Sequence, residues 1–164
     1  MPRFNPCLAL MLLYPSVVWA DPAADAAQCQ QGAGSFLTGT VTRGPRFQGG
    51  KQLHGVYLSH THLTLTDDSG TRYDVAIDNV FAVGYRRNQP SVPAPLNTIR
   101  AGDKLEVCGQ LYSGNDVGIH WVHTNCGETP TADKPDGWVR KVDADGNAGD
   151  NMEANQAFCR LWPD

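Results

Sequence analysis

Histidines gathered in two short stretches are the side chains of this sequence best suited to chemistry. The stretch "SHTH" carries His60 and His62. The stretch "GIHWVH" carries His120 and His123 around Trp121. Imidazole changes its charge near neutral pH and is a common metal ligand, and an indole ring offers a large face for stacking. These residue types therefore indicate metal binding, proton transfer or ligand stacking.

Three uses of these side chains remain open. The first is a non-enzymatic site for a small ligand, on a surface lined by His60, His62, His120, Trp121 and Trp138. The second is a metal-dependent hydrolase of the phosphodiesterase or nuclease type, with Zn, Cu or Ni held by His60, His120 and His123 and with Asp78 assisting. The third is a structural or partner-inhibiting envelope protein, whose histidines are only hydrogen-bonded surface groups. We favour the first, in which the protein is not an enzyme.

Strand periodicity determines which of these histidines can share a face. Residues 55–66 are β-branched, aromatic and alternating, which predicts one long strand. Leu63 and Leu65 form its apolar row and should face the core. Because side chains two residues apart in a strand share a face, His60 and His62 should both point outward.

The second histidine stretch is harder to place on one face. Residues 117–126 are predicted to form a strand, and in a regular strand His120 and His123 would point to opposite sides. They can share a site only if a β-bulge intervenes or if the strand ends before His123.

The whole chain predicts an all-β fold, a small five-stranded OB-like barrel. The expected strands are 35–43, 55–66, 71–77, 103–114 and 117–126. In the fourth of these, Leu105, Val107, Gly109 and Leu111 are expected to face inward. A long hairpin, a connecting segment and a second hairpin are typical of the OB-fold, and a β-sandwich is the main alternative.

The first 20 residues have the features of a cleaved Sec-type signal peptide. Arg3 supplies the positive charge, residues 7–18 form an apolar run, and "VWA" offers a cleavage site after Ala20. Export would place the protein in the periplasm or outside the cell. No other stretch is long and apolar enough for a membrane span.

Beyond the signal peptide, the sequence predicts one domain. We expect a loose leader over 21–34, the OB-like barrel over 35–126 and a C-terminal extension over 127–164 that packs on the barrel. Removing Arg3 from the 13 Lys and Arg leaves 12 against 17 Asp and Glu, a net charge of −5. That balance argues against extensive nucleic-acid binding. The expected partner is a small ligand or a protein, and the expected state is a monomer or a small homo-oligomer.

Four cysteines remain after the signal peptide: Cys29, Cys108, Cys126 and Cys159. An even number in an oxidising compartment indicates two disulfides, for which three pairings are possible. We favour Cys126–Cys159, which would tie the polar C-terminal tail to the barrel, and this leaves Cys29–Cys108. A Cys/His metal cluster is the alternative, but the chain lacks the C-x2-C spacing.

The stretch "GIHWVH", followed after eleven residues by "PDGWV", resembles the H-W-x-H…G-W signature of a bacterial family, the domain of unknown function 3465. The similarity runs from about Gly39 to Trp138. The matching residues are Gly39, Val41, His60, Gly102, Asp103, Leu105, Gly109, His120, Trp121, His123, Gly137 and Trp138, and "IDN" at 77–79 approximately matches a family N-I-D.

The resemblance implies an OB-like fold, a site near His120 and a loop that folds back so that Trp138 covers the histidine strand, but it implies no particular reaction. Two departures weaken part of any family site. Residues 124–126 stand where the family commonly carries a further His or Asp-Pro, and Lys134 or its neighbours replace a family histidine.

Overall fold

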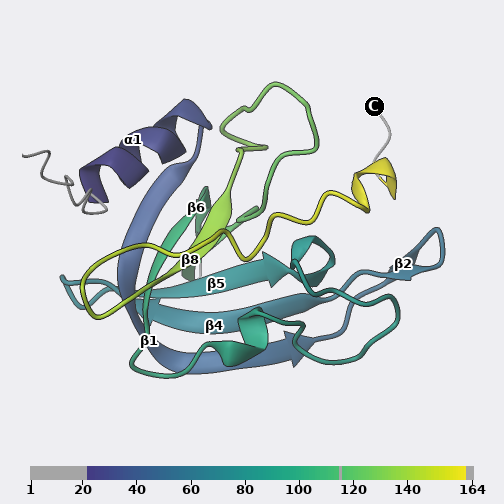
Figure 1. Cartoon of the computed structure of the whole chain (residues 1–164), viewed down its shortest axis with the longest axis horizontal. Coiled ribbons are helices and arrows are strands. Elements are labelled where there is room, and N and C mark those ends of the chain that lie inside the picture. The colour runs from purple at the N-terminus through teal and green to yellow at the C-terminus, as the bar shows by residue number, and fades with distance from the viewer. Residues whose placement is uncertain (1–21, 115, 162–164) are drawn as a thin grey trace, which may run out of the picture.

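The computed structural model describes residues 22–114 and 116–161, and its centre is a closed β-barrel (Figure 1). The main sheet has the order β1-β4-β5-β7-β6-β8, and a further pairing of β1 with β6 closes five of these strands into a barrel. The strands are β1 (Ser35–Gln48), β4 (His60–Thr66), β5 (Arg72–Asp78), β6 (Lys104–Ser113), β7 (Val117–His120) and β8 (Trp138–Val142). The predicted all-β, five-stranded OB-like barrel is confirmed.

Shorter elements surround the barrel. A two-stranded sheet of β2 (Gln52–Leu53) and β3 (Val56–Tyr57) lies in the connection from β1 to β4. The helical segments are α1 (Pro22–Gln31), η1 (Asn79–Phe81), η2 (Leu96–Thr98) and η3 (Cys159–Leu161). Within the described residues, no helix has both the length and the apolar character that a membrane crossing requires.

Alternation of buried and partly exposed residues is strict in β4, whereas β6 is buried on both faces from Leu105 to Gly109. The fully buried side chains include Leu63, Leu65, Val75, Ile77, Leu105, Val107 and Ile119. Each such side chain contributes about 1.5–3 kcal/mol relative to an exposed one. On β4 the inward row leaves His60 and His62 on the opposite, partly exposed face, as the sequence predicted.

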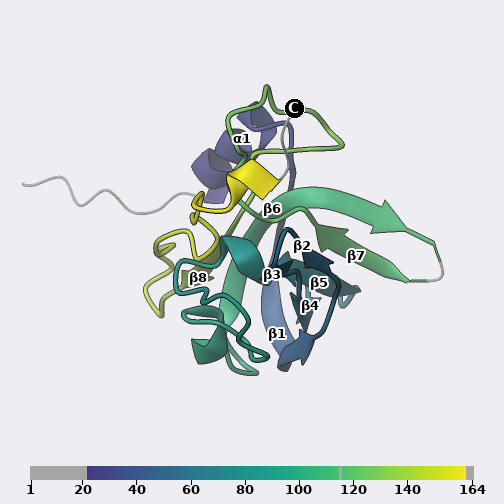
Figure 2. The ribbon, with the colours of Figure 1, turned by 90° about the vertical axis from the view of Figure 1, so that its right-hand side faces the viewer.

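Two of the predicted strands are shorter than expected. Residues 55–66 form two separate strands, β3 and β4, and the predicted strand over 117–126 already ends at His120. Leu111 is 47% exposed and does not face the core as predicted. The reason is that β1 accompanies β6 only as far as Gly109, so the rest of β6 has only β7 beside it. Figure 2 shows this β6–β7 hairpin extending away from the barrel.

The N-terminal segment is more ordered than the sequence suggested. The leader expected over 21–34 was predicted to be loose, but most of it forms α1. Cys29 in this helix is buried and bonded to Cys108 of β6, and Arg140 Nη1 lies 2.6 Å from Asp25 Oδ1. A covalent bond and an ion pair therefore hold α1 to the sheet. The predicted signal peptide over 1–20 lies outside the described residues.

The C-terminal extension contributes a strand before it crosses the barrel. Its β8 pairs with β6, from Cys108 opposite Trp138 to Lys104 opposite Val142. The chain then runs back to η3 near the C-terminus (Figure 1). The Cys126–Cys159 disulfide fastens this tail, and the Cys29–Cys108 disulfide is the second bridge. The predicted disulfide-tied tail and both pairings are confirmed.

Candidate functional site

A pocket of about 530 Å³ lies where β4 begins and where β5 and β7 end. Its volume is in the range of small-molecule sites. The polar lining includes Lys51, Ser59, His60, Asp78, His120, His123, Asn125, Glu128 and Lys134. The apolar lining includes Leu58, Val80, Phe81 and Trp121. Residues far apart in the sequence meet here because three strand ends open at one end of the barrel.

The centre of the pocket is a hydrogen-bonded His–Asp pair. His60 is the first residue of β4 and lies directly opposite Asp78, the last residue of β5. The His60 Nε2 lies 2.6 Å from Asp78 Oδ1. This hydrogen bond raises the pKa of His60, against the opposing effect of burial. Burial by itself would raise the pKa of Asp78, but the His60 hydrogen bond and three nearby imidazoles bring that pKa below its usual value.

His123 reaches the same carboxylate from the other side. Its ring is 4% exposed and stacks on Phe81 with a centroid distance of 3.7 Å and an interplanar angle of 2°. The Nδ1–H donates to the carbonyl oxygen of Thr124 at 3.0 Å. The Nε2 lies 3.9 Å from Asp78 Oδ2. Burial lowers the pKa of His123, so the ring is neutral near pH 7.

The end of β7 allows both motif histidines to serve one pocket. His120 is the last residue of β7, and its ring meets Tyr112 edge-on at 5.3 Å. The next residue, Trp121, has a φ of +56°. This left-handed conformation is rare for a bulky residue and costs on the order of 1–3 kcal/mol. It breaks the alternation of the strand, so His120 and His123 line the same pocket.

Trp121 supplies an aromatic surface beside the histidines. Its side chain is half-buried, lines the pocket and lies 5.2 Å from the His123 ring. A residue in this position can stack on a flat ligand while its neighbours offer polar contacts. The sequence prediction that Trp121 belongs with His60 and His120 therefore agrees with the placement of the three side chains.

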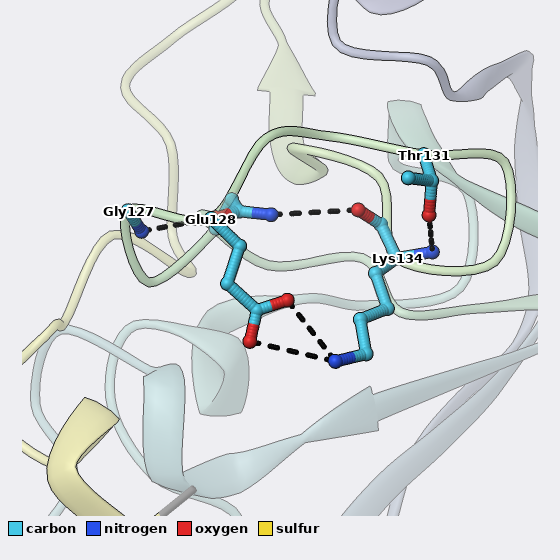
Figure 3. A network of polar contacts seen from close by, with 5 residues as sticks. Gly127, Glu128, Thr131 and Lys134 are labelled. Atoms are coloured by element: carbon cyan, nitrogen blue, oxygen red, sulfur yellow. Dashed lines mark hydrogen bonds and ion pairs between the residues drawn. The ribbon is translucent and has the colours of Figure 1, made fainter. Parts of the chain in front are cut away.

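The loop after the histidine strand forms the rim of the pocket. Glu128 and Lys134 reach toward each other across this loop in Figure 3, with Lys134 Nζ 3.0 Å from Glu128 Oε2. The Lys134 N–H also donates to Thr131 Oγ1 at 3.2 Å. Because both ionised groups are partly exposed, the ion pair contributes no more than about 1 kcal/mol. Its role is to shape the rim.

Two residues predicted for the ligand face do not line this pocket. His62 is directed to Asp74, with Nδ1 2.9 Å from Asp74 Oδ2, and Tyr112 donates to the same oxygen at 2.9 Å. Trp138 is buried in β8, where its ring packs against Phe36 at 5.8 Å.

The position of Trp138 follows from strand pairing. Trp138 lies opposite Cys108 on the neighbouring strand, packs with the Cys29–Cys108 bridge and has the Arg140 guanidinium 4.2 Å above its ring. The loop before it does return to the histidines, because the Gly137 N–H donates to the His123 carbonyl oxygen at 2.8 Å. Trp138 is therefore a core residue next to that loop and does not cover the histidine strand.

Two residues, one beside the pocket lining and one within it, gave no recognisable signal in the sequence. Glu153 is fully buried, and neither of its carboxyl oxygens has a hydrogen-bond partner. Burial, followed by the charge of Asp78, raises its pKa well above the usual value. Phe81 follows the third predicted strand in a short helical turn, and only the fold shows that its ring supports His123.

The pocket combines apolar walls with a cluster of polar side chains. It offers a hydrogen-bonded His–Asp pair, a second imidazole with an unprotonated nitrogen, and an aromatic face. In the part of the chain that the structure describes, no three His, Cys, Asp or Glu side chains are already arranged to hold a metal ion. The predicted ligands His60, His120 and His123 nevertheless all line this pocket.

Comparison with known proteins found no matching family model, no matching curated protein and no matching solved structure. The resemblance to the domain of unknown function 3465 family therefore stays a prediction, carried only by the residues quoted above.

Proposed function

We propose that this protein is an exported small-ligand-binding protein and that its ligand occupies the pocket around Asp78. One observation carries the proposal: His60 and His123 approach the Asp78 carboxylate, at 2.6 and 3.9 Å, in a pocket that His120 and Trp121 also line. Ligand sites usually combine apolar walls with a few polar groups that fix orientation. Here Leu58, Val80 and Phe81 supply apolar walls.

The position of the pocket on the barrel also supports ligand binding. The OB-fold commonly binds its ligands on its second and third strands and the adjoining loops. In this chain those strands are β4 and β5, which carry His60 and Asp78. Gly50 and Lys51 of the preceding connection also line the pocket.

Export is supported by the disulfides and by the predicted signal peptide. Disulfides persist in oxidising compartments, and this small chain has two. We therefore propose the periplasm or the extracellular space as the location. Amino-terminal sequencing of the protein secreted from a bacterial host would test the cleavage after Ala20.

Fragment screening by NMR would test the binding function. We expect small aromatic and polar fragments to shift the backbone amide signals of pocket residues, with EDTA present so that metal ions play no part. The Trp121→Ala variant should weaken these hits at least about tenfold, the equivalent of about 1.4 kcal/mol. His62→Ala is the matched control, because it removes an imidazole from the same strand that does not line the pocket and whose ring centroid lies 6.2 Å from that of His60. Its affinity should equal that of the wild type.

A screen without any fragment bound in the pocket would contradict the proposal. Equal weakening in Trp121→Ala and His62→Ala would also contradict it, because the effect would then not belong to this pocket. A parallel assay of bis(4-nitrophenyl) phosphate hydrolysis separates binding from the hydrolase alternative, since a binding protein should give no turnover that depends on Asp78.

A further inference from the structure

Two hydrogen-bond acceptors face each other beside the buried His123 ring. A carbonyl oxygen can only accept, so the His123 nitrogen that contacts Thr124 O must carry the ring proton. In the neutral ring the other nitrogen, Nε2, then presents a lone pair. That lone pair faces Asp78 Oδ2 at 3.9 Å. Two acceptors that face each other in this way repel one another unless a positive group lies between them.

A second proton on His123 would not bridge the gap between its Nε2 and Asp78 Oδ2. If His123 were doubly protonated, its Nε2–H would still be 3.9 Å from the carboxylate oxygen, which is beyond hydrogen-bond distance. A cation with bonds of about 2.0–2.2 Å to nitrogen and oxygen would satisfy both groups with only a small change in their separation.

We infer that the pocket binds a divalent transition-metal ion of the zinc class through His123 Nε2, the Asp78 carboxylate and His60 Nε2, with His120 within the same pocket as a fourth donor. This inference rests on the proposed binding function, because it assigns one class of ligand to the same pocket. The donors are borderline in softness, with imidazole nitrogens and one carboxylate, and such a set is typical of zinc sites.

The surroundings of His123 have the features that hold a metal-binding imidazole in place. Ligating histidines usually donate their other ring N–H to a carbonyl or carboxylate, which fixes the tautomer and the ring direction. The Thr124 carbonyl does this for His123, and the parallel Phe81 ring fixes the plane.

One rearrangement completes the donor set. His60 Nε2 now donates to Asp78 Oδ1 at 2.6 Å, so it must release that proton before it can bind a metal ion. The His60 side chain is 39% exposed, which leaves it room to turn. The metal ion thus replaces one proton between His60 and Asp78, and it also binds His123 Nε2.

Calorimetric titration of the metal-free, disulfide-bonded protein with Zn²⁺ tests the inference. We expect one ion per chain. His60→Ala and Asp78→Asn should each weaken binding at least about tenfold, because even the loss of an outer partner of a metal ligand costs about 10–100-fold. His62→Ala is the control and should bind as the wild type does. Titration with Co²⁺ adds a readout of the ligands, since its visible absorption should appear in the wild type and be lost in both pocket variants.

Two results would overturn the inference: no saturable zinc binding by the wild type, or wild-type binding in His60→Ala and Asp78→Asn. The test uses a variant at His60 and none at buried His123, because a substitution of a partly exposed residue disturbs folding less. The fragment screen in EDTA distinguishes the two proposals. Fragments that bind in the pocket without zinc binding would overturn only the metal site, whereas a failure of both would also remove the binding function.

Discussion

Two His–Asp pairs lie on the same two strands, with their histidines two residues apart and their aspartates four, and their surroundings differ. His60 and Asp78 are direct cross-strand neighbours at the strand ends, whereas His62 reaches diagonally to Asp74 farther along the sheet. The second pair is completed by Tyr112, which donates to Asp74. Among the described residues, no hydroxyl group donates to the first pair in this way, and the pair instead faces other pocket side chains.

The difference shows that position along a strand decides what a His–Asp pair can do. Within the sheet, cross-strand neighbours satisfy the hydrogen-bonding groups, and the result is a stabilising polar contact. At the strand ends the chain turns away, and the loop after β7 brings His123 to the free side of Asp78. The same residue types thus form a cross-strand polar contact within the sheet and a candidate binding site at the strand ends.

The largest expected effect comes from breaking the Cys126–Cys159 bridge. Cys126 lines the pocket, and the bridge closes a loop with a sequence separation of 33. The double variant Cys126→Ser/Cys159→Ser should lower the free energy of unfolding by about 3–4 kcal/mol, because the unfolded chain gains freedom.

Urea denaturation measures this loss, and NMR spectra then compare the two pairs. The signals of His60 and Asp78 should change, since the rim of their pocket is loosened, while those of His62 and Asp74 should not. Equal changes at both pairs would show that the tail supports the whole barrel and not the pocket in particular.

A smaller effect is expected for Tyr112→Phe, which tests the pair outside the pocket. The variant removes the hydrogen bond to Asp74 and should lower the free energy of unfolding by about 0.5–1.5 kcal/mol. Ligand and zinc binding should be unchanged, although the Tyr112 ring touches His120, because the aromatic ring is kept. Urea denaturation with a parallel zinc titration checks both statements, and weakened zinc binding would mean that the two pairs are coupled.

The smallest expected effect is a pH dependence that differs between the two imidazoles beside Asp78. The hydrogen bond to Asp78 raises the pKa of His60 above 6.5, and burial lowers that of His123 below 6.5. The His60 interaction therefore stabilises the fold fully below about pH 6.5, and this contribution is lost as the pH rises through the folded-state pKa. For His123 the sign is opposite: stability is lost as the pH falls below 6.5.

NMR titration of the imidazole signals in metal-free protein measures both midpoints. In Asp78→Asn the midpoint of His60 should fall, because its charged partner is removed. A His60 midpoint at or below 6.5 in the wild type would contradict the proposed role of the hydrogen bond.

The sequence was sufficient to predict features that depend on local alternation. The outward direction of His60 and His62 follows from the apolar row Leu63 and Leu65 on the same strand, because period-two alternation is a property of neighbouring residues. The five-stranded barrel was predictable for the same reason.

Features that depend on distant contacts were not predictable from the sequence. Trp121 adopts a left-handed backbone conformation although it is not a glycine. The sequence therefore left open whether the side chains of His120 and His123 share one face. Trp138 carries a family-like motif, but its burial is determined by pairing with a strand some thirty residues earlier. Glu153 lies in a polar tail, and only the fold shows that it is fully buried.

The pairing of the four cysteines along the sequence has a consequence for how the disulfides form. The first and second of the four bonded cysteines pair with each other, as do the third and fourth. A chain that crosses a membrane N-terminus first presents Cys29 and Cys108 before Cys126 and Cys159. An oxidant that joins thiols in their order of emergence would make both native bridges directly. Maturation of this protein would then need a dithiol oxidase but no disulfide isomerase.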